Sequence, residues 1–561
     1  MKIAANKFID RWETLKKLRP DTLAEDVMEF FFPFRSVRKR TDTNRLGNET
    51  LYDGTGQRSA YTLAAVMQSS LMGQSSEWFK FRFVDEQFNE KQDFKALLDK
   101  IETRTKNYLQ CSNFYPEMGG FFHEGVVLPA ATAFCNTAYD QIKRRNVLNV
   151  TNIPFEQAWI AENEDHRVDT VYRMYTETAR NIVTQFGESR ISESTPAISE
   201  KFKEAAKKSP DDKFEILHVV QPSKDSDYST RNKAHKWINL YTLLEKSQDT
   251  QILSSTDRGV EGFPNFPYLN FRWLKINGNP YAFTPAMFSL PDCRTLNKII
   301  ELNLKAIEKE ILPSGFIRAG AGEPAKTIQF RPGVFITMRD VSENSIRFAP
   351  PMGNPNFVNF VIKEYQAVIK AAMYIDQVSF PPLEMQGTPA TATEISYRNA
   401  YANRILAPIF GRFSYETADP GMDRIIYLIK EMGGYIEDGS DLYDQLLYNG
   451  AQPYLEYEGP LARNQRFEET ISIDETLQFY GQFKETVPEI DDRLKIGDMI
   501  EERSRIRGLR ERFIYSKDEA KKREKNRVAA IQQQQQMEMI NLGADAMAKA
   551  GKSGMGQGMT G

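Results

Sequence analysis

Residues 289–311 read SLPDCRTLNKIIELNLKAIEKEI, and their apolar residues recur at the spacing of an α-helix. Successive apolar positions lie 4, 4, 3 and 4 residues apart, at Leu296, Ile300, Leu304, Ile307 and Ile311. Ser289 is a suitable N-cap, and Pro291 suits the first helical turn. Lysine and glutamate occupy the other faces. The stretch therefore predicts an amphipathic helix with one apolar stripe.

A second helix is predicted over 356–376, NFVNFVIKEYQAVIKAAMYID, and it is apolar on more than one face. One stripe contains Phe357, Val361, Tyr365, Val368 and Ala372, and another contains Val358, Ile362, Ile369 and Met373. Such a helix has to be buried from several directions. A core within one chain satisfies this requirement and is the favoured interpretation. Neighbouring copies in a ring would satisfy it too.

Outside these two helices the pattern changes several times. Residues 315–349 are β-rich, and the Pro-rich stretch SFPPLEMQGTPA (379–390) interrupts the helical pattern. A capping box, Thr391 with Glu394, begins a long helix that runs to about residue 415.

The N-terminal part, up to about residue 205, is predicted to be mostly helical. Helices are expected from residue 60 to Gly73, over 94–109 and over 168–186, with a short strand over 78–83. FEILHVVQPS (214–223), HKWINLYTLLEK (235–246) and PYLNFRWLKING (267–278) predict a meander of antiparallel strands. The C-terminal third is again helical, and its Gly/Met-rich end is predicted to be disordered. The predicted fold class is α+β, mostly helical.

Composition excludes several classes of protein. The chain has 561 residues, and 73 basic against 76 acidic side chains give a net charge of −3, without the basic excess of a dedicated nucleic-acid clamp. Three cysteines cannot form a disulfide framework, and four scattered histidines offer little for a metal site. No targeting sequence or membrane-spanning segment is predicted, because no apolar stretch approaches the roughly 20 residues needed.

Catalytic motifs are incomplete wherever they occur. Gly551-Lys552-Ser553 resembles the end of a phosphate-binding loop, but Ala546 stands where the first glycine belongs. Gly320-x-Gly322-x-x-Ala325 precedes a β-rich run instead of a helix, unlike a dinucleotide fingerprint. The acidic pairs 491–492 and 501–502 are interpreted as solvated, and His123 in FFHEG as a packed or interface histidine. We therefore predict that the protein is not an enzyme, with no catalytic residue, cofactor or metal.

Several segments, taken in order, resemble the head-to-tail connecting proteins of podoviruses, the portal family of short-tailed bacteriophages. The matching stretches are RSAYTLAAVMQSSLMGQSSEWF (58–79), SNFYPEMGGFFHEG (112–125), ILHVVQPS (216–223), FPYLNFRWLKINGNPYAFTPAMFSLPDCRTLNK (266–298), RPGVF (331–335), TPATATEISYRNAYANRILAPIFGRF (388–413) and PLARNQ (460–465). One departure is Ala282 after Tyr281, where the family usually has glycine.

The resemblance implies a portal-type architecture with wing, stem, clip, tunnel loop and crown, assembled as a ring of twelve copies. Carried over by position, the parts are an N-terminal wing (1–288), a first stem helix (289–311), a clip (312–352), a second stem helix (353–376), a tunnel loop (377–390), a long helix returning to the wing (391–480), crown helices (481–540) and a disordered tail (541–561).

The same resemblance implies functional residues in three of these parts. The residues expected to face DNA in the tunnel loop are Gln377, Glu384, Gln386, Gly387 and Thr388. Those expected to line the stem channel are Lys298, Lys305, Lys309, Lys363 and Lys370. Those expected to dock other proteins at the clip are Arg318, Lys326 and Arg331.

The implied role is a channel for packaging and ejecting double-stranded DNA at one capsid vertex, assembled in the host cytoplasm and located in the virion. Implied partners are further copies of the chain, the major capsid protein, scaffolding protein, the terminase large subunit, a tail adaptor and non-specifically bound DNA, with no membrane. Two alternatives stay open. One is another ring-forming virion component, such as a tail adaptor or internal core protein. The other is a nucleic-acid-processing enzyme that uses the basic region 501–530.

Overall fold

The computed structural model describes most of the chain in a series of segments. They are residues 5–36, 51–75, 78–85, 88, 91–142, 144–186, 190–192, 195–196, 204, 207–225, 235–244, 255–256, 259–276, 278–312, 315–318, 335–338, 346–348, 355–378, 406–437, 439–448, 450, 452–457, 460–483, 495–506, 522–523, 525–537 and 539–541. The chain divides into two compact units. Unit 1 comprises residues 1–80, 101–443 and 455–464, and unit 2 comprises 81–100, 444–454 and 465–561.

A six-stranded antiparallel sheet forms one part of unit 1. Its strand order is β10-β11-β9-β8-β5-β4. The strands are β4 (Ala158–Glu162), β5 (Val168–Thr178), β8 (Lys213–Pro222), β9 (Trp237–Leu243), β10 (Ser255–Thr256) and β11 (Gly259–Phe263). Helix α7 (Ala179–Phe186) adds Ile182 and Phe186 to a small cluster with Ile216 and Leu243 of the sheet.

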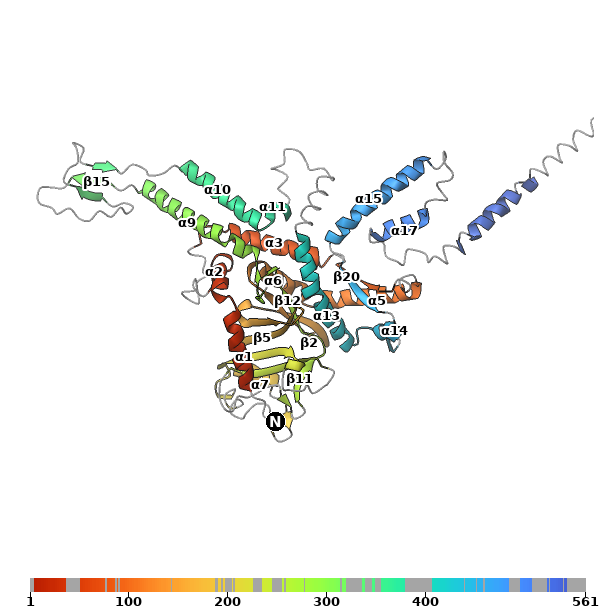
Figure 1. Ribbon diagram of the computed structural model, residues 1–561, viewed down its shortest axis with the longest axis horizontal. Coiled ribbons are helices and arrows are strands. Elements are labelled where there is room, and N and C mark those ends of the chain that lie inside the picture. Colours follow the sequence, from red (N-terminus) through yellow and green to blue (C-terminus); the bar gives the residue numbers. More distant parts are fainter. Residues whose placement is uncertain are drawn as a thin grey trace, which may run out of the picture. The chain divides into compact units, whose positions relative to one another are not determined.

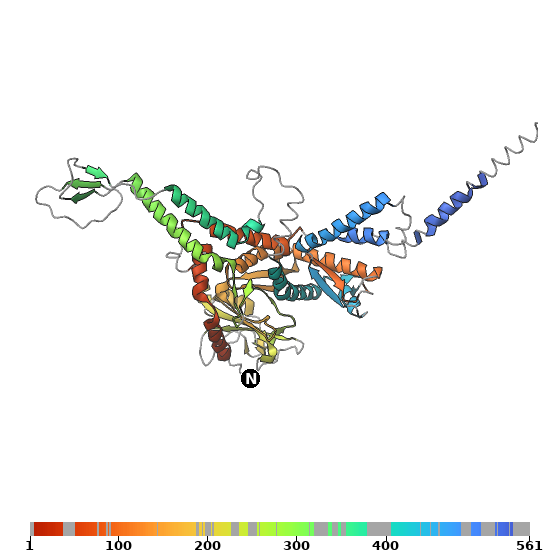
Figure 2. The same cartoon turned by 45° about the horizontal axis from the view of Figure 1, so that its top comes forward.

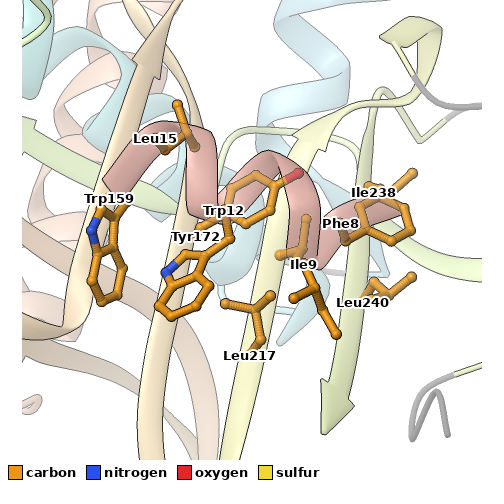
Figure 3. Packing of buried hydrophobic residues seen from close by; sticks show 10 residues of the cluster. Phe8, Ile9, Trp12, Leu15, Trp159, Tyr172, Leu217, Ile238 and Leu240 are labelled. Atoms are coloured by element: carbon orange, nitrogen blue, oxygen red, sulfur yellow. The ribbon is translucent and has the colours of Figure 1, made fainter. Parts of the chain in front are cut away.

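Helix α1 (Ala5–Leu18) packs on this sheet through one apolar face (Figure 3). Phe8, Trp12 and Leu15 recur at helical spacing and are buried. The indole rings of Trp12 and Trp159 of β4 meet edge to face, with centroids 5.2 Å apart. Tyr172, Leu217, Ile238 and Leu240 complete the cluster.

A three-stranded antiparallel sheet, β12-β2-β3, lies elsewhere in unit 1. It contains β2 (Ala131–Asp140), β3 (Arg145–Ile153) and β12 (Tyr268–Phe271). Helix α6 (Phe114–Val127) packs against β2 and β3 and also against α3 (Thr55–Leu71). The side chain of Asn113, just before α6, donates to the Val150 carbonyl at 2.7 Å and accepts from the Val150 amide at 2.8 Å. This pairing covers part of the outer edge of β3.

Further helices and strands are α2 (Asp21–Phe31), β1 (Phe79–Phe83), α5 (Gln92–Gln110), η2 (Phe155–Gln157), β6 (Arg190–Ser192), β7 (Thr195–Pro196), η3 (Ser223–Asp225), β13 (Leu274–Lys275), β14 (Ala282–Phe283), α9 (Pro285–Ile311), β15 (Gly315–Arg318), β16 (Phe335–Met338), β17 (Ile346–Phe348), α10 (Pro355–Ala372), α11 (Ile375–Val378), η5 (Ser414–Ala418), α13 (Asp419–Glu431), β18 (Ile436–Glu437), β19 (Ser440–Asp441), α14 (Leu442–Tyr448), β20 (Pro453–Tyr457), α15 (Pro460–Phe483) and α17 (Ile496–Ile506). Residues 406–413 and 525–537 are also helical. Figures 1 and 2 show the elements of unit 1 as ribbons, coloured in the order of the sequence. Within unit 2, Arg503 of α17 forms an ion pair with Asp474 of α15, in which Arg503 Nη2 donates to Asp474 Oδ2 at 3.1 Å.

A buried arginine joins separate segments of unit 1. The Arg272 side chain is 0% exposed and donates five hydrogen bonds. Both Glu416 oxygens accept from it at 2.9 and 2.7 Å, Glu162 accepts a further bond, and the carbonyls of Pro280 and His166 accept at 3.0 and 2.9 Å. Glu416 lies in η5, a π-helical turn. Pro420 follows it, and a proline cannot donate to the carbonyl four residues earlier, so the wider turn accommodates it.

Several sequence predictions are corrected by these elements. The predicted helix 168–186 is strand β5 followed by the short helix α7. Because β2 to β5 lie before residue 205, that region is not mostly helical. Strands β8 and β9 are neighbours as the predicted meander requires, but β12 pairs with β2 in the other sheet.

The two predicted stem helices are present with different ends. Helix α9 begins at Pro285, four residues before the predicted start, because Thr284 and not Ser289 is its N-cap. The second predicted helix ends at Ala372, and α11 follows it. The β-rich stretch between them contains β15, β16 and β17 as expected, with β15 parallel to β16 and antiparallel to β17.

Candidate functional site

The base of α9 is firmly attached to the rest of unit 1. The Thr284 hydroxyl donates to the Val127 carbonyl at 2.9 Å and accepts from the Met287 amide at 3.4 Å. An ion pair of 2.9 Å joins Arg294 to Asp26 of α2. Leu296, two residues further along, is 0% exposed. The first half of α9 is therefore part of the core.

A short segment before α3 connects α9 to α10. The Tyr52 amide donates to Asn297 Oδ1 of α9 at 2.7 Å. The next residue is Asp53, and its Oδ2 accepts a hydrogen bond from Gln366 Nε2 of α10 at 3.0 Å. Asp53 Oδ1 accepts from the Thr55 amide at 2.8 Å, which fixes the carboxylate at the start of α3. The two helices are thus held together near their attached ends.

Both helices expose large apolar side chains, most of them beyond this point. No residue of α9 after Leu296 is buried in the described part of the chain. Its exposed apolar residues there are Leu302 (55%), Leu304 (47%), Ile307 (38%) and Ile311 (72%). On α10, Phe357 is 66% exposed, Phe360 64% and Val368 46%, whereas Ile369 is fully buried. We call these seven exposed residues the bare face of the helix pair.

The bare face corrects one interpretation of the sequence. A core within a single chain was favoured for 356–376, but among the residues of α10 whose burial is described only Ile369 is buried, and Met373 follows just after the helix. Helices α9 and α10 lie side by side, as both views show (Figures 1 and 2), so each covers only one face of the other. Exposed apolar patches of this kind mark interaction sites. Within the described residues, a core of the same chain does not cover the apolar faces of α10.

The five lysines predicted to line a channel are all exposed on α9 or α10. Lys298 and Lys305 both bind the Glu301 carboxylate, Lys298 at 2.9 Å. Hydrogen bonds from Lys305 and Lys298 lower the pKa of Glu301 to about 2. Lys309, Lys363 and Lys370 are also exposed. The charged face of α9 is therefore internally paired and not uniformly basic.

The other predicted site residues are described only in part. Gln377 lies in α11 and Arg318 ends β15. Glu384, Gln386, Gly387, Thr388, Lys326 and Arg331 lie outside the described residues, as do the capping box at 391–394 and the tail 542–561. No prediction about these residues is tested by the structure.

The residues that attach the helix pair were not found from the sequence. Thr284 followed by Pro285 is a typical N-cap and first-turn pair, so this signal was present. Asp26, Tyr52 and Asp53 carried no such signal, because they lie more than two hundred residues from their partners on α9 and α10. Pairs that distant in sequence form only through the tertiary fold.

His123 is packed, as the sequence predicted. Its ring contacts Phe32 and Tyr61, with centroids 4.6 and 5.8 Å away. Burial and the nearby Arg35 charge lower the pKa of His123 to about 4, so the ring is neutral at physiological pH. Among the described residues, no group of histidine, cysteine and carboxylate side chains is arranged to hold a metal ion. None of the described helices is both long and apolar enough to cross a membrane.

The neighbouring Glu124 is a buried carboxylate. Arg35 donates to Glu124 Oε1 at 2.8 Å and to Glu156 Oε1 at 3.2 Å. Burial raises the pKa of Glu124 to about 7, although the Arg35 charge and hydrogen bond act in the opposite direction. The folded protein therefore holds this proton more tightly than the unfolded chain does.

We expect Glu124→Gln to reduce the loss of stability as the pH rises. Between about pH 4.5 and pH 7 the unfolded chain releases the Glu124 proton and the folded protein keeps it, so stability falls with rising pH. Glutamine cannot ionise. The difference in free energy of unfolding, variant minus wild type, should therefore increase from pH 5 to pH 8 in urea titrations. A difference independent of pH would contradict this account of Glu124.

Comparisons with known proteins agree with the portal resemblance. The model of the family described as "Bacteriophage head to tail connecting protein" matches residues 5–514. A probable portal protein of Bordetella phage BPP-1 is 23% identical over 552 residues, covering 97% of this chain and 94% of that protein. The portal protein of Salmonella phage epsilon15 is 23% identical over 526 residues, covering 92% and 89%. The chain belongs to the bacteriophage head to tail connecting protein family.

Proposed function

We propose that the protein is a portal that assembles as a closed ring of about twelve copies and conducts double-stranded DNA. The observation that supports this most is the contrast along α9 and α10. Both helices are attached at one end, and along their length they expose seven large apolar side chains. Copies placed side by side in a ring would cover these side chains on both flanks.

The dimensions of such a ring suit a DNA duplex. Packed helices lie about 9–10 Å apart, so twelve in a circle give a diameter of roughly 37 Å between helix axes. Side chains take up about 5 Å on each side, which leaves a bore of roughly 27 Å. A duplex about 20 Å wide passes through it with room for water.

The charges on α9 suit passage better than tight binding. Each phosphate that a protein neutralises makes binding more sensitive to salt and strengthens the hold on DNA. The ion pairs of Lys298 and Lys305 with Glu301 reduce the positive charge that the helix would present. A channel wall of this kind contacts DNA but binds it weakly.

The remaining assignments rest on the family resemblance and the sequence. We infer that 312–352 is the clip and 377–390 the tunnel loop, between a wing that begins the chain and a crown near its end. In this proposal the wing meets the capsid protein and the scaffold, and the clip binds terminase during packaging and the tail adaptor afterwards.

Charge reversal in the clip should separate docking from assembly. With Arg318, Lys326 and Arg331 all replaced by glutamate, we expect ring formation as in wild type and at least about tenfold weaker binding of the tail adaptor, because lost and reversed charges at an interface oppose association. Sedimentation of purified rings with the adaptor measures both properties. Unchanged adaptor affinity would move the docking surface away from 312–352.

Electron microscopy of the purified protein in negative stain tests the proposed function. The proposal predicts rings with a central pore wide enough for a duplex. Compact particles without a pore, over a range of salt and protein concentrations, would contradict it.

A further inference from the structure

The hairpin of β2 and β3 ends in exposed apolar side chains. The two strands pair from Thr132 with Ile153 out to Asp140 with Arg145. Strand β12 pairs with β2 only as far as Phe134, so among the described strands the outer half of the hairpin is a two-stranded ribbon. At its end Ile142 is 94% exposed and Tyr139 is 63% exposed. Ile142 is unusual, because turn positions normally carry polar residues or glycine.

The same turn is basic. Arg144 and Arg145 are both exposed, and neither forms an ion pair with any described residue. The turn is also locally fixed, because Asp140 Oδ1 accepts from the Ile142 amide at 2.8 Å. We call Tyr139, Ile142, Arg144 and Arg145 the hairpin tip. It presents two apolar and two positively charged side chains to whatever covers it.

A surface of complementary character lies at the turn between β4 and β5. Glu164 and Asp165 are exposed there and form no ion pair within the described chain. Tyr415 is 46% exposed, and the Arg167 guanidinium stacks 3.5 Å from its ring centre. The Arg167 amide donates to Asn163 Oδ1 at 2.9 Å, which places Tyr415 beside the acidic turn. We call Glu164, Asp165 and Tyr415 the acidic turn surface.

The two surfaces of one chain lie far apart. The acidic turn is attached to Arg272, whose Nη2 donates a hydrogen bond to the His166 carbonyl at 2.9 Å. The preceding residue, Phe271, pairs with Ala131 at the start of β2. The hairpin tip follows Asp140 at the other end of that strand, and nine steps of about 3.3 Å separate the two ends by roughly 30 Å. The hairpin tip therefore cannot cover the acidic turn of its own chain.

We propose that the hairpin tip of each copy docks on the acidic turn surface of the next copy. In this contact Arg144 and Arg145 face Glu164 and Asp165, and Ile142 and Tyr139 lie against Tyr415. Two different patches at separate places on one chain make a head-to-tail contact, which closes into a ring when the rotation between copies is right. The inference rests on the proposed ring and adds a second contact between copies, away from α9 and α10.

Two complementary charge-reversal variants test the contact. The first is Arg144→Glu with Arg145→Glu, and the second is Glu164→Lys with Asp165→Lys. Each should lower the fraction of chain in rings about tenfold at a concentration where half of the wild type is assembled, because like charges then face each other. Lys207→Glu with Lys208→Glu reverses two other exposed, adjacent lysines and should assemble like wild type.

An equimolar mixture of the two variants gives the decisive result. In an even-numbered ring the variants can alternate, and every interface then joins opposite charges. The mixture should regain the ring fraction of wild type in native mass spectrometry, with equal numbers of each variant. A mixture that stays unassembled, or a first variant that assembles as well as the lysine control, would overturn the inference while leaving rings of wild type intact.

A further variant, Ile142→Ser, separates an effect on assembly from an effect on folding. Ile142→Ser keeps both arginines and should still lower the ring fraction several-fold, with an unchanged melting temperature of the monomer, because Ile142 is almost fully exposed. Assembly of this variant at the wild-type level would count against the contact. If wild type itself forms no ring, the proposed function fails and this inference fails with it.

Discussion

Phe360→Asp is expected to leave the chain folded and to abolish ring assembly. Phe360 is 64% exposed on α10, so a charge at this position meets water in the monomer. The free energy of unfolding should stay within about 0.5 kcal/mol of wild type, as for other surface substitutions. In the ring the same carboxylate would be buried without a partner, which is strongly unfavourable. We expect the ring fraction to fall by more than about a hundredfold, measured by analytical ultracentrifugation.

Two control variants make this result specific. Asn359→Asp introduces the same residue at the adjacent exposed position of α10 and should assemble like wild type. Leu296→Asp introduces it at a fully buried position of α9 and should instead destabilise the monomer by several kcal/mol. Normal rings from Phe360→Asp would show that this side of α10 faces solvent in the assembly.

Arg272→Met is expected to cause the largest loss of stability in unit 1. All five N–H donors of the guanidinium are used, and the side chain is 0% exposed. Methionine leaves the largely covered carboxylates of Glu416 and Glu162 without this partner, although Arg412 still binds Glu416 at 3.2 Å and Lys275 still binds Glu162 at 2.8 Å. Removing one partner of a buried ion pair lowers the free energy of unfolding by about 3–5 kcal/mol. Urea unfolding of the variant and of wild type measures this difference.

A second substitution and the pH dependence test the cause. Adding Glu416→Gln to Arg272→Met removes a carboxylate that has lost its two bonds to Arg272 and keeps only Arg412, and it should recover part of the loss. Burial tends to raise the pKa of Glu162, but hydrogen bonds and charges from Lys275 and Arg272 outweigh it, and the pKa is lowered overall. The stability from this pairing is therefore present at neutral pH and lost as the pH falls through the lowered pKa. A loss below about 1 kcal/mol at pH 7 would mean that Arg272 is not the link described above.

Local sequence patterns predicted the helices better than the sheets. The stripe from Leu296 to Ile311 gave a helix with the correct C-terminal end, because its spacing depends only on neighbouring turns. The stretch 168–186 was wrongly predicted to be helical. Its first part is a strand because Val171 and Tyr172 pair with Val220 and Val219, about fifty residues further on. The partner segment 214–223 was predicted to be a strand from its own sequence, but no local pattern in 168–178 indicates a partner at that separation.

The sequence predicted the apolar character of the candidate site, but not how much of it the same chain covers. Apolar residues on several faces of 356–376 indicated that the helix needs more than one neighbour. How far the chain itself supplies these neighbours depends on contacts such as Asp53 with Gln366, which no local pattern encodes. The hairpin tip was missed for the same reason, since Ile142 is conspicuous only once the turn around it is known.

The mass of the native assembly tests the central claim most directly, namely that other copies of the chain cover the bare face of α9 and α10. With a chain mass of 64.5 kDa, a ring of twelve copies has a mass of about 770 kDa. Native mass spectrometry should show closed species at or near this mass for wild type and only monomer for Phe360→Asp. Monomer or dimer alone for wild type at every salt concentration tried, or the same large species for both proteins, would contradict the account.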